Sequence, residues 1–233
     1  MGDPPNGTRD TSPHAALRLA LEAATPHASV AVLRGGAVLA EARAEMRPGG
    51  DEALMPAVHA ALTDAGVRPR DLTAVVCGAG PGGFTSLRIA GAIAKGMAHA
   101  TGCALLAVPS LALAAAGRGA GTWLVTLDAL RGERYAAWTT VDDAGAVAEY
   151  GYLGVLGERA LASERARAGA AGVIDANAEP PRAAAVAAFV DRLAPVDLDA
   201  WEPLYGRLAE AQARWELAHG RPLASALGAA ADS

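Results

Sequence analysis

The residues with the clearest chemical character form a glycine-rich stretch, Gly78-Ala79-Gly80-Pro81-Gly82-Gly83. It joins an apolar run at residues 72–77 to a helical pattern at residues 85–100. A glycine turn that leads from a strand into a helix directs backbone N–H groups and the positive end of the helix dipole toward one point. Such a point can bind an anion, so Gly80, Gly82 and Gly83 are candidate contacts for a phosphate or a nucleotide. The alternative is a tight turn that needs glycine only for its backbone geometry.

Two familiar phosphate-binding motifs do not fit this stretch. Gly78, Gly80 and Gly83 have the spacing G-x-G-x-x-G, but a dinucleotide site also needs an acidic residue about twenty positions further on. The apolar run at residues 103–108 contains no acidic residue. A P-loop requires Gly-Lys-Ser or Gly-Lys-Thr, which does not follow the glycines. The sequence therefore disfavours both an NAD site and a P-loop.

Asp128 is a second candidate for binding a phosphate or a metal ion, because it ends a predicted strand in the second half of the chain. The simpler interpretation is that its carboxylate caps a turn at the strand end, and the sequence favours this interpretation. Metal binding by a helix has little support, because the histidines at positions 14, 27, 59, 99 and 219 include no pair four residues apart.

The composition limits the classes of partner and compartment. The chain has 233 residues, of which 52% are hydrophobic, and its formal net charge is −5. A core is therefore expected, whereas attraction to nucleic acids or anionic membranes is not. Cys77 and Cys103 lie in apolar runs, which favours buried free thiols and a cytoplasmic setting. Residues 1–14 are polar and rich in proline, which predicts a disordered leader.

The hydrophobic pattern predicts an α/β protein with the same order of elements in both halves. Strands are expected at residues 17–21, 29–34, 37–44, 72–77, 104–108, 122–128, 134–141, 146–150 and 172–175. Helices are expected at residues 51–65, with Asp51 as N-cap, at 85–100, from 110, at 158–168 and at 182–193. Each half gives three strands in hairpins, a helix, a strand and a helix. This order is that of the actin-like ATPase (ribonuclease-H-like) fold, with one lobe at residues 15–117 and a second at 118–233 that includes a closing helix at 201–219.

Several ordered motifs resemble those of one protein family. Two segments resemble the signature of the TsaB (YeaZ) family. They are residues 80–89, Gly-Pro-Gly-Gly-Phe-Thr-Ser-Leu-Arg-Ile, and residues 94–98, Ala-Lys-Gly-Met-Ala. Gly83 and Ser86 depart from that signature, which has serine and glycine there. Residues 127–135 and 203–207 are similar to two further family segments. Glu22 stands where nucleotide-handling relatives have a shorter aspartate after the first strand, so we expect this position to be altered or unused.

The resemblance implies a non-catalytic subunit of the machinery that makes threonylcarbamoyladenosine in tRNA. Its expected partner is a TsaD-type subunit, which transfers the threonylcarbamoyl group to N6 of the adenosine beside the anticodon. That paralogue holds a metal ion partly with two histidines four residues apart, and Ser110 and Ala114 stand at those positions here. The resemblance therefore implies no catalytic residue and no metal site in this chain. ATP or ADP and the metal ion would be held by partner subunits, which include a TsaE-type ATPase. This chain would contact tRNA only indirectly, and no membrane would be involved.

The family resemblance also implies that the two helices at residues 51–65 and 85–100 contact the partner, or a second copy when the chain is alone. The residues expected in this interface are Leu54, Val58, Arg88, Ile89, Gly91, Ala92, Ile93, Lys95 and Met97. The alternative is that their apolar faces pack on the protein's own sheet and that Arg88 and Lys95 are ordinary surface charges. A second function also stays open, namely an active ATP-binding phosphotransferase or ATPase of the same fold that uses Asp128 and the glycine turn.

Overall fold

The computed structural model describes residues 16–47, 52–167, 171–189, 192–206 and 218–220. The expected leader at residues 1–14 and the N-cap at Asp51 lie outside these residues, as do residues 207–217 of the expected closing helix. Residues 201–206, where that helix was expected to begin, are not helical, so this part of the prediction was wrong. Within the described part, no helix is long and apolar enough to cross a membrane.

The first lobe is built on a five-stranded mixed sheet in the order β3-β2-β1-β4-β5. Its strands are β1 (Leu17–Glu22), β2 (His27–Arg34), β3 (Ala37–Glu45), β4 (Ala74–Gly78) and β5 (Ala104–Val108). The first three strands are antiparallel hairpin neighbours, and β4 and β5 run parallel to β1. β1 and β4 are almost fully buried, as expected for central strands with covered faces.

The second lobe repeats the first four positions of this sheet with the order β8-β7-β6-β9. Its strands are β6 (Gly121–Asp128), β7 (Arg134–Val141), β8 (Val147–Leu156) and β9 (Gly172–Asp175). β6, β7 and β8 are antiparallel, and β9 lies parallel to β6. This repeated order confirms the two-lobed α/β fold of the actin-like, ribonuclease-H-like class.

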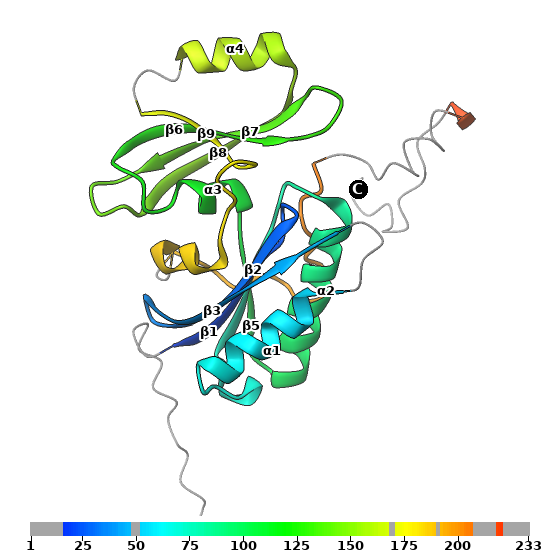
Figure 1. Cartoon of the computed structure of the whole chain (residues 1–233), viewed down its shortest axis with the longest axis vertical. Coiled ribbons are helices and arrows are strands. Elements are labelled where there is room, and N and C mark those ends of the chain that lie inside the picture. Colours follow the sequence, from blue (N-terminus) through cyan, green and yellow to red (C-terminus); the bar gives the residue numbers. More distant parts are fainter. Residues whose placement is uncertain (1–15, 48–51, 168–170, 190–191, 207–217, 221–233) are drawn as a thin grey trace, which may run out of the picture.

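The helices cover the two sheets and fill the space between them. They are α1 (Leu54–Asp64), α2 (Phe84–Thr101), α3 (Ser110–Ala115) and α4 (Glu158–Arg167), with short 3-10 helices η1 (Pro69–Asp71) and η2 (Ala183–Phe189). Figure 1 shows α1 and α2 on one face of the first sheet, α3 and η2 between the lobes, and α4 on the outer face of the second sheet. The helix expected at residues 182–193 is thus a shorter 3-10 helix, whose first N–H, at Ala183, donates to Ser29 Oγ of β2.

One apolar core belongs to both lobes. On one face of the first sheet, α1 and α2 enclose a core that includes Leu21, Val58 and Ala94. On the other face, residues of the first sheet pack in the same cluster as α3, η2 and side chains of the second sheet such as Val125 and Ile174. The lobes are therefore joined by continuous packing.

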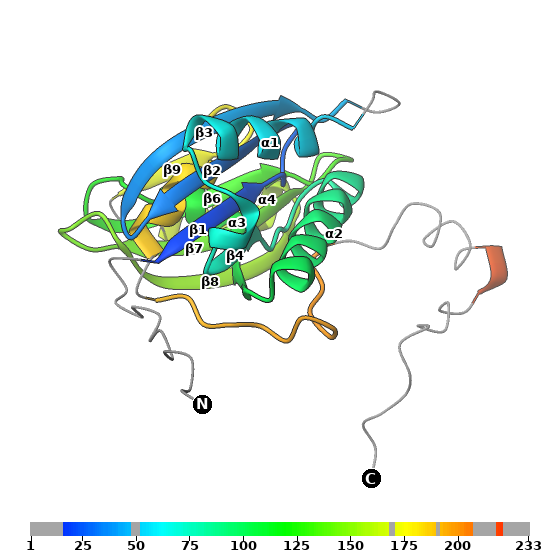
Figure 2. The same ribbon diagram turned by 90° about the horizontal axis from the view of Figure 1, so that it is seen from below.

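Residues 192–206, the return segment, follow the second lobe in sequence but pack on the first. Val196 N–H donates to Leu105 O at 2.9 Å and covers the edge of β5, and Leu204 N–H donates to Ala79 O at 2.8 Å. Figure 2 shows this segment, in orange, running along the molecule to the N-terminal end of α2. The division of the chain at residues 117 and 118 stays a prediction, and the return segment crosses it.

Candidate functional site

The glycine turn between β4 and α2 has most of its backbone donors engaged within the protein. Ala79 N–H donates to Val108 O at 2.7 Å, and Gly83 N–H donates to Ala24 O at 2.9 Å. Gly80 N–H donates to Ser110 Oγ at 3.0 Å. Pro81 has no N–H group. Three of the N–H groups of this turn, at Ala79, Gly80 and Gly83, therefore already have acceptors within the protein.

At two of the three candidate glycines, a side chain would collide with another part of the same protein. Gly80 has φ +80°, and a Cβ there would lie 2.3 Å from Leu204 O in the return segment. A Cβ at Gly82 would lie 2.3 Å from Ala24 O in the β1–β2 turn. Gly83 differs, since the nearest atom to its Cβ would be Ser86 Oγ at 3.6 Å. The geometry of the turn, and not a ligand, explains Gly80 and Gly82, whereas the space at Gly83 would accept the serine of the family signature.

Glu22 lies beneath this turn at the end of β1 and is 1% exposed. Its Oε1 accepts a hydrogen bond from Ala24 N–H at 2.7 Å, whereas Oε2 has no partner among the described residues. Burial raises the pKa of the Glu22 carboxyl to about 7, and the hydrogen bond from Ala24 opposes only part of this effect. A Cβ at Gly78 would lie 2.0 Å from Oε2, so Gly78 leaves the space that the carboxyl occupies. This enclosed carboxyl supports the expectation that the site is altered relative to nucleotide-handling relatives.

Asp128, at the end of β6, has the geometry of a turn cap. Its Oδ1 accepts a hydrogen bond from Leu130 N–H at 2.9 Å. The turn that follows is tight, because Leu130 and Arg131 have positive φ values of 63° and 57°. The hydrogen bond agrees with the simpler of the two interpretations of Asp128.

The return segment also lies between the glycine turn and the second lobe. The Tyr205 ring lies 4.7 Å from the ring of Phe84, the first residue of α2. Tyr135 of β7 donates from its hydroxyl to Tyr205 O at 3.2 Å. Tyr205 therefore connects the start of α2 to the second lobe. The sequence motif at residues 203–207 marked this segment.

The helix surface expected to meet a partner is smaller than the sequence suggested. Leu54 and Val58 of α1 are fully buried in the core beneath the first sheet, so they are not available to a partner and this part of the expectation was wrong. Their positions face the sheet because the apolar stripe of α1 supplies the core, and the neighbouring Met55 is exposed. On α2, the side chains of Ile89, Ile93 and Met97 are half-buried against the same core.

The return segment covers a further part of α2. Gly91 is buried, and a Cβ there would lie 3.3 Å from Pro203 Cγ. Lys95 Nζ lies 3.3 Å from Glu202 Oε1 in an ion pair and 3.4 Å from the backbone oxygen of Asp199. A shallow pocket of about 170 Å³ remains, and it is lined by Arg88, Ala92, Trp201, Tyr205 and neighbouring residues. No local sequence pattern connects this part of the return segment with α2.

Arg88 and Ala92 are the members of the expected interface that are clearly exposed. Arg88 places its guanidinium 5.4 Å from the centre of the Phe84 ring, a cation–π contact that orients the charge beside the pocket. An exposed alanine beside an oriented cation leaves space for another protein to approach α2 closely.

The positions at which the catalytic paralogue has histidines lie inside the fold. Ser110 is fully buried at the start of α3 and its hydroxyl accepts the hydrogen bond from Gly80, while Ala114 is 9% exposed. Within the described residues, no group of three or more His, Cys, Asp or Glu side chains is placed to hold a metal ion. Cys77 and Cys103 are free thiols, as expected, although Cys103 is only half-buried.

Comparisons with known proteins agree with these sequence motifs. The family model described as TsaD, tRNA N6-adenosine threonylcarbamoyltransferase, matches residues 50–149. An uncharacterised protein of Mycobacterium bovis is 41% identical over 124 residues, which cover 50% of this chain and 56% of that protein. The tRNA threonylcarbamoyladenosine biosynthesis protein TsaB of Bacillus subtilis is 36% identical over 119 residues, which cover 50% of this chain and 52% of that protein. The chain thus spans about half the length of the curated relatives it matches.

A solved structure extends the likeness over most of the fold. A Pseudomonas aeruginosa protein, described as having similarity to peptidase YEAZ, matches with a TM-score of 0.67 and 25% sequence identity. The match covers 82% of this chain and 100% of that one. Together with the relatives named TsaB, this likeness confirms the resemblance to the TsaB (YeaZ) family.

Proposed function

We propose that this chain, as a member of the TsaB (YeaZ) family, is a non-catalytic subunit in the synthesis of threonylcarbamoyladenosine in tRNA. In this role it binds a TsaD-type catalytic subunit and supports the active conformation of that partner. The reaction at N6 of the adenosine beside the anticodon takes place on the partner. A TsaE-type ATPase belongs to the wider complex, and tRNA reaches this chain only through the other subunits.

The observation that best supports this proposal is how residues 80–98, which resemble the family signature, pack within the fold. Residues 80–98 form the glycine turn and most of α2, and the turn is closed by contacts with Ala24, Ser110 and Leu204. What α2 still presents is an exposed face at Arg88 and Ala92 beside the shallow pocket. A segment whose turn is packed against its own chain, and whose helix has an exposed face, is better suited to binding a protein than to catalysis.

The alternative function, an ATP-dependent phosphotransferase or ATPase that uses the glycine turn, gains no support from this geometry. Three of the N–H groups of the turn are engaged, the carboxyl of Glu22 is buried, and Asp128 accepts a hydrogen bond within a turn. In the proposed role the metal ion and the ATP or ADP of the reaction belong to partner subunits in the cytoplasm. The same α2 face joins two copies of the chain when no partner is present.

A matched pair of substitutions tests the proposed interface. Ala92→Arg places a large charged side chain on the exposed face of α2, and Ala162→Arg places the same side chain on the exposed face of α4 in the other lobe. We expect Ala92→Arg to weaken co-purification with a TsaD-type subunit at least tenfold, because a bulky charge prevents close packing of helices. Ala162→Arg should bind as the wild type does, and unfolding curves of both variants check that the fold is intact.

Two results would contradict the proposal. Equal binding of the two variants would remove α2 from the interface. Full transferase activity of the catalytic subunit without this chain would remove the supporting role itself. Hydrolysis of ATP by the purified chain alone would favour the alternative function.

A further inference from the structure

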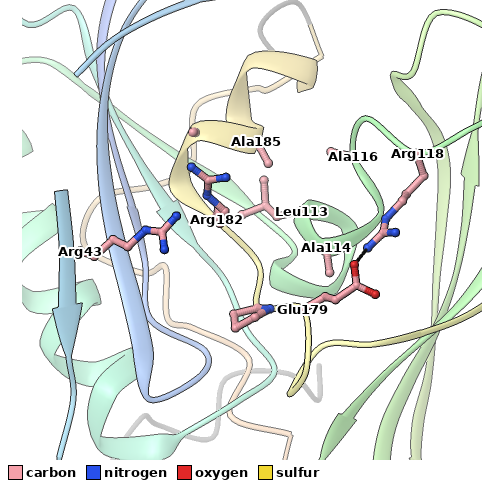
Figure 3. Close-up of a pocket in the computed structure, with 10 residues that line it drawn as sticks. Arg43, Leu113, Ala114, Ala116, Arg118, Glu179, Arg182 and Ala185 are labelled. Carbon is pink, nitrogen blue, oxygen red and sulfur yellow. Dashed lines mark hydrogen bonds and ion pairs between the residues drawn. The ribbon is translucent and has the colours of Figure 1, made fainter. Parts of the chain in front are cut away.

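A cavity with a volume of about 480 Å³ lies between the lobes, and it shares no lining residue with the glycine turn. Three arginines from different parts of the chain line it. Arg43 comes from β3, Arg118 follows α3, and Arg182 precedes η2. Figure 3 shows Arg43 and Arg182 toward one side of the cavity and Arg118 toward the other.

The arginines differ in whether a carboxylate already neutralises them. Arg118 pairs with Glu179, which also lines the cavity, and Arg182 pairs with Glu41 of β3. The side chain of Arg43 has no hydrogen bond or ion pair to any other described residue. With Glu41 counted beside its partner Arg182, three positive charges lie next to two negative charges, and the excess positive charge is that of Arg43, in a protein whose net charge is −5. Such a local excess of positive charge favours an anion at this place.

The floor of the cavity is apolar. Leu113, Ala114 and Ala116 come from α3 and its C-terminal end, and Ala184 and Ala185 come from η2. Small-molecule sites combine such an apolar wall with a few polar groups that fix the orientation of the ligand, and their volumes are roughly 300–1,000 Å³. Guanidinium groups bind phosphate oxygens in pairs through two parallel hydrogen bonds.

We propose that this cavity binds a small organic phosphate of about nucleotide size. Its phosphate group lies against Arg43 and the neighbouring Arg182, and its apolar or aromatic body lies over the alanine and leucine floor. A continuous RNA backbone fits less well, because Glu179 lies in the cavity and the molecule as a whole is negatively charged. The site is independent of the proposed partner-binding face on α2 and of the glycine turn.

Calorimetry with the full chain tests the site, with adenosine monophosphate as the probe. We expect saturable binding of adenosine monophosphate, and binding at least tenfold weaker for adenosine, which has no phosphate, and for inorganic phosphate, which has no apolar body. Arg43→Ala should weaken binding of adenosine monophosphate at least tenfold. Arg34→Ala removes another exposed arginine of the first sheet that does not line the cavity, and it should bind as the wild type does.

The variants are compared only after their unfolding curves show the same stability as the wild type. Arg43→Lys keeps the charge but loses the paired hydrogen bonds, so its affinity should lie between those of the wild type and Arg43→Ala. Absence of saturable binding by adenosine monophosphate, or equal binding by wild type and Arg43→Ala, would overturn the proposal. Binding of a tRNA that depends on Arg43, with no binding of the mononucleotide, would also overturn it and assign the cavity to RNA.

Discussion

The glycine turn and the arginine cavity are two places where this protein could bind an anion, and they differ in whether their donors are free. The turn has the glycines and the helix start that are typical of an anion-binding loop, yet three of its N–H groups donate to Val108, Ser110 and Ala24. The cavity has no sequence motif, yet the side chain of Arg43 has no partner within the described part of the chain. A motif therefore identifies a backbone shape, whereas the capacity to bind a ligand depends on which donors the fold leaves unsatisfied.

Among the substitutions that test this comparison, we expect the largest effect at Gly80. Gly80→Ala forces an L-residue into φ +80° and places its Cβ against Leu204 O, so both strain and a clash with backbone destabilise the fold. We expect the free energy of unfolding to fall by about 4 kcal/mol in urea titrations. If the turn were instead shaped for a ligand, the substitution would leave stability unchanged.

The control for this substitution is Gly96→Ala on the exposed side of α2, where nothing lies within 4 Å of the new Cβ. There we expect a gain of about 0.5–1 kcal/mol, because alanine favours a helix over glycine. The opposite signs of the two effects separate the packing role of Gly80 from a general intolerance of α2 to alanine.

The next effect concerns the pH dependence of stability. The pKa of Glu22 is raised by burial from 4.5 to about 7 in the folded state, so the folded protein holds this proton between those values. Stability therefore falls as the pH rises from about 4.5 to 7, and the loss is complete above pH 7. Its size is of the order of 3 kcal/mol. Glu22→Gln, which still accepts from Ala24 N–H, should remove this part of the pH dependence and should be more stable than the wild type at pH 8.

Unfolding curves of both proteins at pH 5 and pH 8 measure the difference. Parallel pH profiles for wild type and Glu22→Gln would contradict the raised pKa and would mean that the carboxyl is hydrated. A hydrated carboxyl would reopen the glycine turn as a site that water and ions can reach.

The smallest of the three effects is expected for Ser110→Ala. It removes the acceptor of the Gly80 N–H at a fully buried position, which should lower the free energy of unfolding by about 1–2 kcal/mol. The binding of adenosine monophosphate should not change, because Ser110 does not line the arginine cavity. A loss of affinity in this variant, at a temperature where it is fully folded, would place the bound phosphate at the glycine turn and would reverse the comparison.

Strands and helices could be predicted from the sequence where their own residues show the whole hydrophobic pattern and its ends. The bounds of β5, β7 and β9 agree with the apolar runs, because each run ends at a turn residue or a helix start. β8 extends to Leu156 although a strand was expected only to residue 150. Gly154, with φ +99°, lies at an irregularity in the pairing of β8 with Ala136 and Ala137, and such a bulge interrupts the alternation that indicates a strand.

The candidate site was less predictable, because its determinants are distant in sequence. The apolar stripe of α1 showed that Leu54 and Val58 lie on one face, but not that this face meets the sheet. The sequence likewise contains no signal that residues 192–206 return to cover Gly91 and Lys95. Arg43, Arg118 and Arg182 meet only because two loops and a strand converge, which no local pattern encodes.

The return segment has a consequence for the order in which the molecule forms during synthesis. The glycine turn obtains its final neighbours only when Leu204 docks on Ala79 and Tyr205 on Phe84. Contacts between such distant positions close a long loop, which makes them late events in folding. A ribosome must therefore translate both lobes and the return segment before α2 acquires the surface that a partner would recognise. Recognition of that surface would then be restricted to chains that have folded through residue 205.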